Sequence, residues 1–284
     1  MQTTAQSLTP AEPLEVESEV VPFPVTPAPA MTPAYLAFAA ICLLWGTTFV
    51  AIRIVIETIP TLTVTGFRFF LAGVILFAVA RLMKAVFPRG IGEWRDQAIA
   101  GIVMAGFGNA LVVAAEHTLT SGMAALLAAT IPIWMVVLES LLGSARITVR
   151  SMSGLALGFG GVGLLVAPAI GELHLSAGFL LAVGAMQLSA ICWNAGTLFS
   201  RRRIVHSDPL ARSAIQMLAA GTAMTLLAFV TGERWSVAMF TARSTAALIY
   251  LIIFGSVIAF WCYTYAQTKL SAGKVASYAY VNPA

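Results

Sequence analysis

Eight long apolar runs follow one another along this chain, and they constrain its fold more than any other feature. A helix needs about 20 apolar residues to cross the hydrocarbon core of a bilayer, and every run has about that length. Membrane strands are excluded because the runs are too long and do not alternate. The runs span approximately residues 34–57, 62–83, 97–116, 122–142, 149–168, 176–200, 210–231 and 243–267. The pattern predicts an all-α polytopic membrane protein in which neighbouring helices are antiparallel.

The composition excludes the main alternatives to a membrane protein. Apolar residues make up 59% of the chain and charged residues 10%, with a mean hydropathy of +0.89. A soluble domain has about 25% charged residues, so a soluble enzyme, a nucleic-acid-binding protein and a disordered chain are excluded. Cys42, Cys192 and Cys262 lie inside apolar runs without metal-ligand spacing. No glycine-rich turn precedes Lys-Ser or Lys-Thr, so we expect neither a metal nor a cofactor.

Residues 1–33 and the Lys and Arg residues indicate how the chain is oriented. Residues 1–33 hold seven of the 13 prolines, four Glu and no Lys or Arg, which predicts a disordered tail. Twelve of the 16 Lys and Arg residues fall in connections on the same side of the membrane as this tail. Two fall in connections on the other side, and two lie inside runs. Because basic connections stay inside, the N-terminus is predicted to be cytoplasmic.

An internal repeat divides the chain into residues 34–168 and 176–284. Ala115, Leu119, Gly122, Ala125, Ala128 and Pro132 recur 151 residues later as Ala266, Leu270, Gly273, Ala276, Ala279 and Pro283. Phe107-Gly108 also matches Phe254-Gly255. The repeating unit therefore has five helices. Because five is odd, the second unit enters the membrane from the opposite side, and such inverted repeats are typical of secondary transporters. By this count about 35 residues of the second unit, the last one and a half helices, are absent from this chain.

Several motifs resemble those of a known transporter family. The first run contains Trp45-Gly46-Thr47-Thr48-Phe49, the second contains Arg68-Phe69, and the chain closes on Tyr280-Val281-Asn282-Pro283. These motifs resemble the EamA-type members of the drug/metabolite transporter superfamily. The resemblance implies a ten-helix carrier of the cell inner membrane with two inverted five-helix repeats around a central cavity. It also implies export of amino acids or other small metabolites.

Aromatic, amide and hydroxyl side chains within the runs are the candidate substrate-binding residues. They are Trp45, Thr48, Asn109, Trp193, Asn194, Tyr263 and Tyr278. If they face inward, they would form a cavity suited to zwitterions with apolar side chains, such as neutral or aromatic amino acids moved by alternating access. The alternative is that the aromatic residues only pack together or form belts at the membrane interfaces.

The few charged residues near the runs allow more than one interpretation. Arg53 and Arg68 either extend their charged ends to the membrane interface or form an ion pair with Glu57. The alternative is that they bind a substrate carboxylate. Glu116 and His117 are expected to be solvated at the interface. No predicted span contains Asp, and the first has no carboxylate before Glu57 at its very end, so we expect transport that is downhill or weakly coupled to protons.

Three other functions remain open at this point. Nucleotide sugars or drugs are alternative substrates. An intramembrane enzyme would need clustered acids, His or a nucleophile near one interface, and only scattered ones are present. A scaffold without transport activity is disfavoured by the inverted repeat. The lipid bilayer and a small-molecule substrate are the expected partners, nucleic acid is not, and the sequence does not indicate the oligomeric state.

Overall fold

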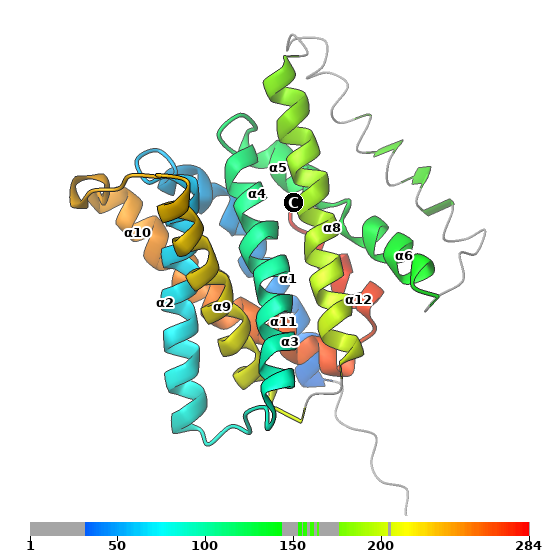
Figure 1. The fold of residues 1–284 in the computed structure, drawn as a ribbon. Coiled ribbons are helices and arrows are strands. Elements are labelled where there is room, and N and C mark those ends of the chain that lie inside the picture. Colours follow the sequence, from blue (N-terminus) through cyan, green and yellow to red (C-terminus); the bar gives the residue numbers. More distant parts are fainter. Residues whose placement is uncertain are drawn as a thin grey trace, which may run out of the picture. The chain divides into compact units, whose positions relative to one another are not determined.

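The computed structural model describes residues 32–143, 176–203 and 206–283, together with residues 153, 154, 156, 157, 160, 161 and 164. The regular elements in these ranges are helices (Figure 1). The α-helices are α1 Thr32–Val55, α2 Thr61–Leu82, α3 Ile91–Gly101, α4 Gly108–Ala115, α5 Ser121–Ala128, α6 Ile131–Leu141, α8 Ala177–Arg202, α9 Pro209–Val230, α10 Ala242–Tyr250, α11 Ala259–Lys269 and α12 Ala272–Ala276. Two π-helical segments, η1 Ile102–Phe107 and η3 Leu251–Ile258, and two 3₁₀ turns, η2 Val237–Met239 and η4 Ser277–Tyr280, complete the set.

Seven of these helical stretches are long and apolar enough to cross a membrane. Three of them combine several elements: Ile91–Ala115 joins α3, η1 and α4, Ser121–Leu141 joins α5 and α6, and Ala242–Lys269 joins α10, η3 and α11. The prediction of an all-α polytopic membrane protein is confirmed. The predicted span 149–168 and residues 1–31 of the tail lie outside the described residues, apart from single positions of that span.

One predicted boundary was wrong, and another shifted by two residues. The third span begins at Ile91 and not at residue 97, because Glu93 and Arg95 make its first turns too polar for a hydropathy signal although they are helical. Asp96 therefore does lie within a span. The first helix begins at Thr32, inside the predicted tail, because Pro33 is tolerated in a first helical turn, where its missing N–H has no partner to lose.

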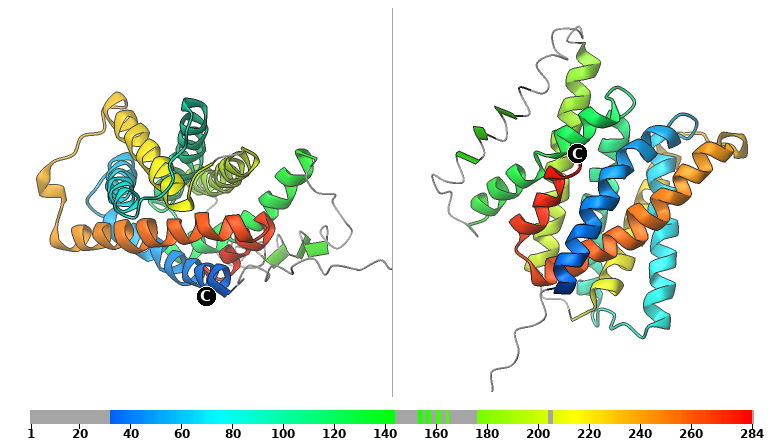
Figure 2. Two further views of the ribbon diagram at one scale, coloured as in Figure 1. Left: turned by 90° about the horizontal axis from the view of Figure 1, so that it is seen from below. Right: turned by 180° about the vertical axis from the view of Figure 1, so that it is seen from behind.

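The most extensive contact between two helices is that of α2 with α9, which run side by side (Figures 1 and 2). Gly73 on α2 and Gly221 on α9 allow the two backbones to approach. A Cβ built on Gly73 would lie 2.6 Å from the backbone nitrogen of Leu218, and one on Gly221 would overlap the backbone of Phe70. Around this pair, α1 packs on α10 and α11, and α8 packs on α3, η1 and α4. Small residues at helix contacts are the usual means of close packing in membranes.

Corresponding features recur in the two halves of the chain. Each contains a π-helical segment at the matched Phe-Gly pair. In the first half η1 ends directly before Gly108, and in the second half η3 includes Gly255. Each also has a capped helix start: the hydroxyls of Thr120 and Ser271, 151 residues apart, accept from a backbone N–H three residues on. These features support the division into residues 34–168 and 176–284, which stays a prediction.

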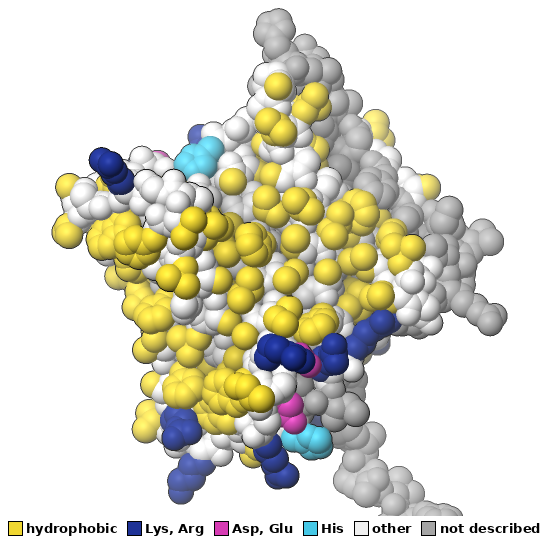
Figure 3. Space-filling model, viewed as in Figure 1, with side chains coloured by type: hydrophobic (Ala, Val, Ile, Leu, Met, Phe, Trp, Pro, Cys, Tyr) yellow, Lys and Arg dark blue, Asp and Glu magenta, His cyan; other side chains and the backbone are white. Residues whose placement is uncertain are grey.

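Charged side chains gather at the ends of the bundle, and the flank between them is apolar (Figure 3). We call the end that carries connections 83–90 and 203–208 the basic end. Figure 3 shows dark-blue side chains near this end, and here Arg203 pairs with Asp96 at 3.4 Å and His206 approaches Glu93 at 3.7 Å. The other end carries connections 56–60 and 116–120, and we call it the opposite end.

Candidate functional site

A cavity lies inside the bundle and is lined by residues of both halves of the chain. Its empty space is about 670 Å³ including its mouth. Five of the seven predicted residues line it, and they are Trp45, Thr48, Asn109, Trp193 and Tyr278. Asn194 and Tyr263 do not line it. Among the described residues, no group of three or more His, Cys, Asp and Glu side chains could hold a metal ion.

The lining residues place the cavity between the middle of the bundle and the opposite end. Ile52 lies in the last turn of α1, Arg68 in the second turn of α2, and Val112 in the last turn of α4, and these turns all adjoin the opposite end. Trp193 and Phe260 come from the middle of their spans and form the floor. Among the described residues, the lining is therefore that of a chamber offset toward the opposite end.

Arg68 is a buried cation in the wall of this chamber. It is 3% exposed. Its Nε donates to Ser256 Oγ at 2.8 Å, and its Nη1 donates to Asn109 Oδ1 at 3.1 Å. For Arg68, snorkelling is contradicted by this burial, and an ion pair with Glu57 is contradicted because Glu57 pairs with Arg243 at 3.2 Å. An Arg side chain can remain inside a bundle when hydrogen bonds from neighbouring helices replace those of water.

The π-helical segments supply hydrogen-bond acceptors in the wall. In a π-helix the backbone bonds shift from the i−4 carbonyl, which frees individual carbonyl groups for other donors. Gly255 O accepts from Trp45 Nε1 at 2.9 Å and from Arg68 Nη2 at 3.4 Å. Gly108, the first residue of α4 directly after η1, accepts at its carbonyl oxygen from Ser189 Oγ at 2.6 Å. At both matched glycines, a side chain from the other half of the chain uses the carbonyl, and this fixes the walls of the cavity relative to each other.

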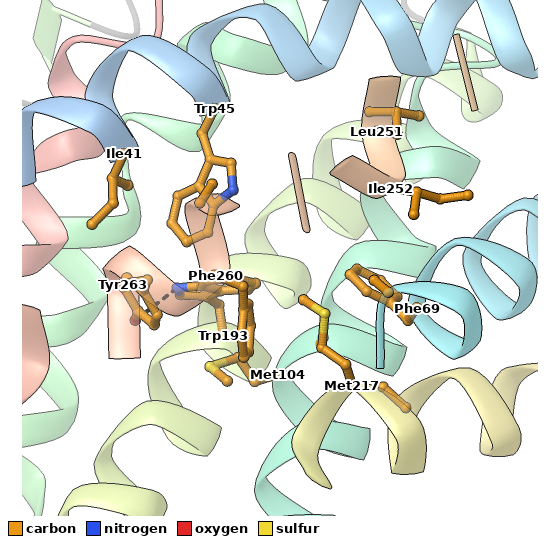
Figure 4. Packing of buried hydrophobic residues seen from close by; sticks show 14 of the residues in the cluster. Ile41, Trp45, Phe69, Met104, Trp193, Met217, Leu251, Ile252, Phe260 and Tyr263 are labelled. Atoms are coloured by element: carbon orange, nitrogen blue, oxygen red, sulfur yellow. Dashed lines mark hydrogen bonds between the residues drawn. The ribbon is translucent and has the colours of Figure 1, made fainter. Parts of the chain in front are cut away.

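Aromatic rings form the floor of the cavity, and Figure 4 shows how Trp45, Trp193 and Phe260 pack together. Trp45 meets Trp193 edge to face, with ring centroids 5.2 Å apart, and meets Tyr278 at 4.7 Å. Tyr263 lies behind Trp193: its hydroxyl accepts from Trp193 Nε1 at 3.0 Å, as Figure 4 shows, and shares a hydrogen bond with Thr197 Oγ1 at 2.7 Å. Tyr263 therefore orients a floor residue and does not reach the chamber itself.

Asn194 also acts behind the wall. Its Nδ2 donates to the carbonyl oxygen of Ile131 at 2.7 Å, at the interruption between α5 and α6. Its side chain is fully buried, and Ile131 itself lines the cavity. Asn194 thus holds a broken helix in place. Sequence reasoning could not distinguish this position from Trp193 beside it, because only the rotation of α8 decides which of the two faces the chamber.

Sequence reasoning missed Ser256, although a signal was present. The match of Phe107-Gly108 with Phe254-Gly255 has an offset of 147, and the same offset pairs Asn109 with Ser256. Both members of this pair accept from the Arg68 guanidinium. The repeat could therefore have identified the second partner of Arg68 once the first had been chosen.

At the end of α4, the structure corrects one expectation and agrees with another. His117 is exposed, and its Nε2 lies 3.0 Å from Thr61 Oγ1. Glu116 is not solvated at the interface, since its side chain is completely buried. The chain turns at Glu116 after the last helical residue, Ala115, so the side chain points back among the helices rather than into the connection.

Comparisons with known proteins agree on one family. Residues 32–167 and 180–284 match the EamA-like transporter family. An uncharacterized inner membrane transporter of Escherichia coli, YedA, is 31% identical over 256 residues, which cover 89% of this chain and 80% of that protein. Protein PagO of Salmonella typhimurium is 28% identical over 243 residues, which cover 84% of this chain and 77% of that protein. A solved crystal structure shares the fold, with a TM-score of 0.66 at 20% identity over 89% of this chain and 85% of the other.

Proposed function

This chain belongs to the EamA-like transporter family, and we propose that it exports neutral or aromatic amino acids across the inner membrane. Its family and its relatives are transporters, so the chain is a membrane transporter and not an enzyme. The substrate class and the outward direction are the proposed parts. The observation that carries the substrate class is Arg68, a buried cation in the wall of an otherwise largely apolar chamber.

Arg68 supports a substrate that carries a carboxylate. Among the described residues no Asp or Glu oxygen lies within 4.0 Å of its guanidinium, and the groups that it contacts are neutral. Guanidinium has five N–H donors in a planar fork that matches a carboxylate. A charge that is buried without an opposite charge is costly, and a bound carboxylate would provide that charge.

The rest of the lining supports an apolar side chain on the same substrate. Trp45, Trp193 and Tyr278 offer ring faces and edges, and Phe49, Ile52 and Met186 add aliphatic and aromatic surface. Ring faces also attract an ammonium group, which provides a place for the second charge of a zwitterion. A nucleotide sugar would bring phosphates and several hydroxyls, and among the described residues Arg68 is the only Lys or Arg whose side chain lines the chamber.

Polar contacts between the floor and the basic end support alternating access. Gln216 Nε2 donates to Gln97 Oε1 at 2.6 Å and to Ser200 Oγ at 3.2 Å, so that α9, α3 and α8 are joined. Ser200 Oγ also donates to Gln97 Oε1 at 3.1 Å. All three side chains are at most 5% exposed. We interpret this cluster as the closed side of a carrier whose chamber now adjoins the opposite end.

Counterflow in proteoliposomes tests the substrate class. Vesicles loaded with unlabelled amino acid would be offered a panel of radiolabelled amino acids, nucleotide sugars and cationic dyes. We expect leucine and phenylalanine to accumulate, and the Arg68→Gln variant to reduce their uptake roughly tenfold or more, because a charge-assisted bond to the carboxylate is lost. Arg243→Gln is the matched control, since it removes an exposed cation near the opposite end.

The result that would contradict the proposal is equally specific. Wild-type vesicles that accumulate dyes or nucleotide sugars and no amino acid would exclude the proposed substrate class. Amino-acid uptake that is equal in wild-type and Arg68→Gln vesicles would exclude the proposed role of Arg68.

A further inference from the structure

Glu116 is a buried carboxyl group beside the cavity. Its side chain is 0% exposed, and neither carboxylate oxygen has a hydrogen-bond partner among the described residues. Buried polar atoms are nearly always paired, and an unpaired carboxylate in such a place is among the most costly exceptions. The position therefore calls for a role that packing does not supply.

The surroundings place this carboxyl at the rim of the chamber. Glu116 N donates to the carbonyl oxygen of Val112 at 3.0 Å, and Val112 lines the chamber one turn below. Asn109, the partner of Arg68, lies seven residues earlier on the same stretch, and so on the same face of α4. Glu116 is thus stacked above the residues that hold the Arg68 guanidinium.

Two cations act on Glu116, and they come from the two helices beside it. Arg53 of α1 donates from Nη1 to the backbone carbonyl oxygen of Glu116, and Arg68 of α2 is the second cation. The neighbouring His117 is exposed and hydrogen-bonded to Thr61, with its pKa lowered by burial of part of the ring and by Arg53.

Burial outweighs the two cations. It raises the pKa of the Glu116 carboxyl to about 9, while Arg53 and Arg68 act in the opposite direction. The group follows the last residue of its span, Ala115, and so lies near the opposite end of the bundle. In the described conformation it holds a proton at neutral pH.

We propose that Glu116 is a proton-binding site linked to substrate binding at Arg68. When Glu116 is neutral, the Arg68 guanidinium is available to the substrate carboxylate. When Glu116 loses its proton, the new carboxylate is attracted to Arg68 and Arg53 and repels the substrate. Two carboxylates thus compete for the same positive charge, so substrate binding and proton binding at Glu116 favour each other. The link to substrate rests on the function proposed above, and the proton site itself does not.

Infrared titration tests the proton site without any substrate. The protein in lipid is brought from about pH 6 to about pH 10 while the C=O stretch of protonated carboxylic acid is followed. We expect a band in the wild-type protein that disappears in the alkaline range, is missing in Glu116→Gln and is recovered in Glu116→Asp. Glu57→Gln is the matched control, because it removes a half-exposed Glu at the same end, and it should keep the band. A wild-type spectrum identical to that of Glu116→Gln would overturn the proposal.

Leucine counterflow at different pH values tests the link. We expect the KM of the wild-type protein for leucine to rise about fivefold or more between about pH 7 and about pH 10. The Glu116→Gln variant stays neutral at position 116 throughout, so its KM should change only as far as the loss of leucine's own ammonium proton changes it, and that loss affects both proteins alike. An equal rise of KM in the wild-type protein and in the Glu116→Gln variant would overturn the link. If no amino acid is transported at any pH while the infrared band behaves as expected, the proposed substrate is wrong and the proton site stands.

Discussion

At the scale of single residues, Gly255 is the position where one methyl group should matter most. A Cβ built on it would lie 2.9 Å from Thr48 Cγ2 and 3.1 Å from Arg68 Nη2, so Gly255→Ala has to push two lining residues aside. The matched Gly108 has its nearest neighbours at 3.5 Å, which is ordinary contact. We expect Gly255→Ala to weaken amino-acid counterflow about tenfold and Gly108→Ala to change it little. Equal effects of the two variants would contradict this.

Tyr263 should contribute to stability more than to substrate affinity. Tyr263→Phe leaves the Trp193 N–H and the Thr197 hydroxyl without their shared partner, although Thr197 keeps a contact with the Met104 sulfur at 3.3 Å. The expected cost is about 1–3 kcal/mol, because the affected groups are buried. A thermal unfolding curve in detergent should show a lower midpoint, while the KM for leucine stays close to that of the wild-type protein. A raised KM with an unchanged midpoint would place Tyr263 in the chamber instead.

At the scale of helices, the contact between α2 and α9 depends on glycine. Gly73→Ala brings a methyl group within 2.6 Å of the backbone of Leu218, and a backbone cannot move aside as a side chain can. We expect a large loss of correctly folded protein, measured as the monodisperse fraction after extraction. Gly184→Ala on α8 is the control, because a Cβ there has no neighbour within 4 Å. A normal yield of Gly73→Ala would show that the two helices can separate without cost.

The polar cluster of Gln97, Ser200 and Gln216 should hold the basic end closed. Gln216→Ala removes the amide that joins α9 to α3 and α8, so the basic end should open more often. With Ser189→Cys as a reporter in the chamber wall, an impermeant thiol reagent added at the basic end should react only when Gln216→Ala is also present. Reaction from that side without Gln216→Ala would mean that the cluster is no barrier.

At the scale of the whole molecule, the orientation in the membrane follows from the basic end. Interior connections carry most Lys and Arg, so the basic end should face the cytoplasm and the chamber the outside. Thr118→Cys in an exposed connection of the opposite end should be labelled by an impermeant thiol reagent in intact cells, and Gly90→Cys at the basic end should not. Replacing Cys42, Cys192 and Cys262 by Ser gives the background. The reverse labelling pattern would invert the predicted orientation.

The two halves of the molecule contribute differently to the two ends. Helices α2 and α9 begin 148 residues apart, and this offset pairs Arg68 with Gln216. Arg68 joins α2 to Asn109 and Ser256 beside the chamber, and Gln216 joins α9 to Gln97 and Ser200 near the basic end. If the two halves are inverted repeats, as the sequence predicts, matched positions lie on opposite sides of the site between them. The cluster around Arg68 thus borders the open chamber, and the cluster around the matched Gln216 is closely packed.

The sequence by itself determined the class of molecule, the spans and much of the site. Length and hydropathy suffice to predict spans, because a helix of about 20 apolar residues is stable in the hydrocarbon core of a bilayer whatever its neighbours are. They failed at Ile91, where polar first turns such as those at Glu93 lie outside the apolar core yet remain helical. The aromatic and amide types at Trp45 and Asn109 could be selected as lining residues because such side chains seldom lie inside a membrane helix without a purpose.

Only the tertiary structure decided which polar residues face the chamber and which stand behind it. Asn194 and Trp193 are neighbours in sequence, and the rotation of α8 about its axis puts them on different sides of the wall. Arg68 meets Ser256 across 188 residues of chain, and the burial of Glu116 depends on how α1, α2 and α4 converge. Such contacts are set by packing between distant segments, and no local pattern carries that information.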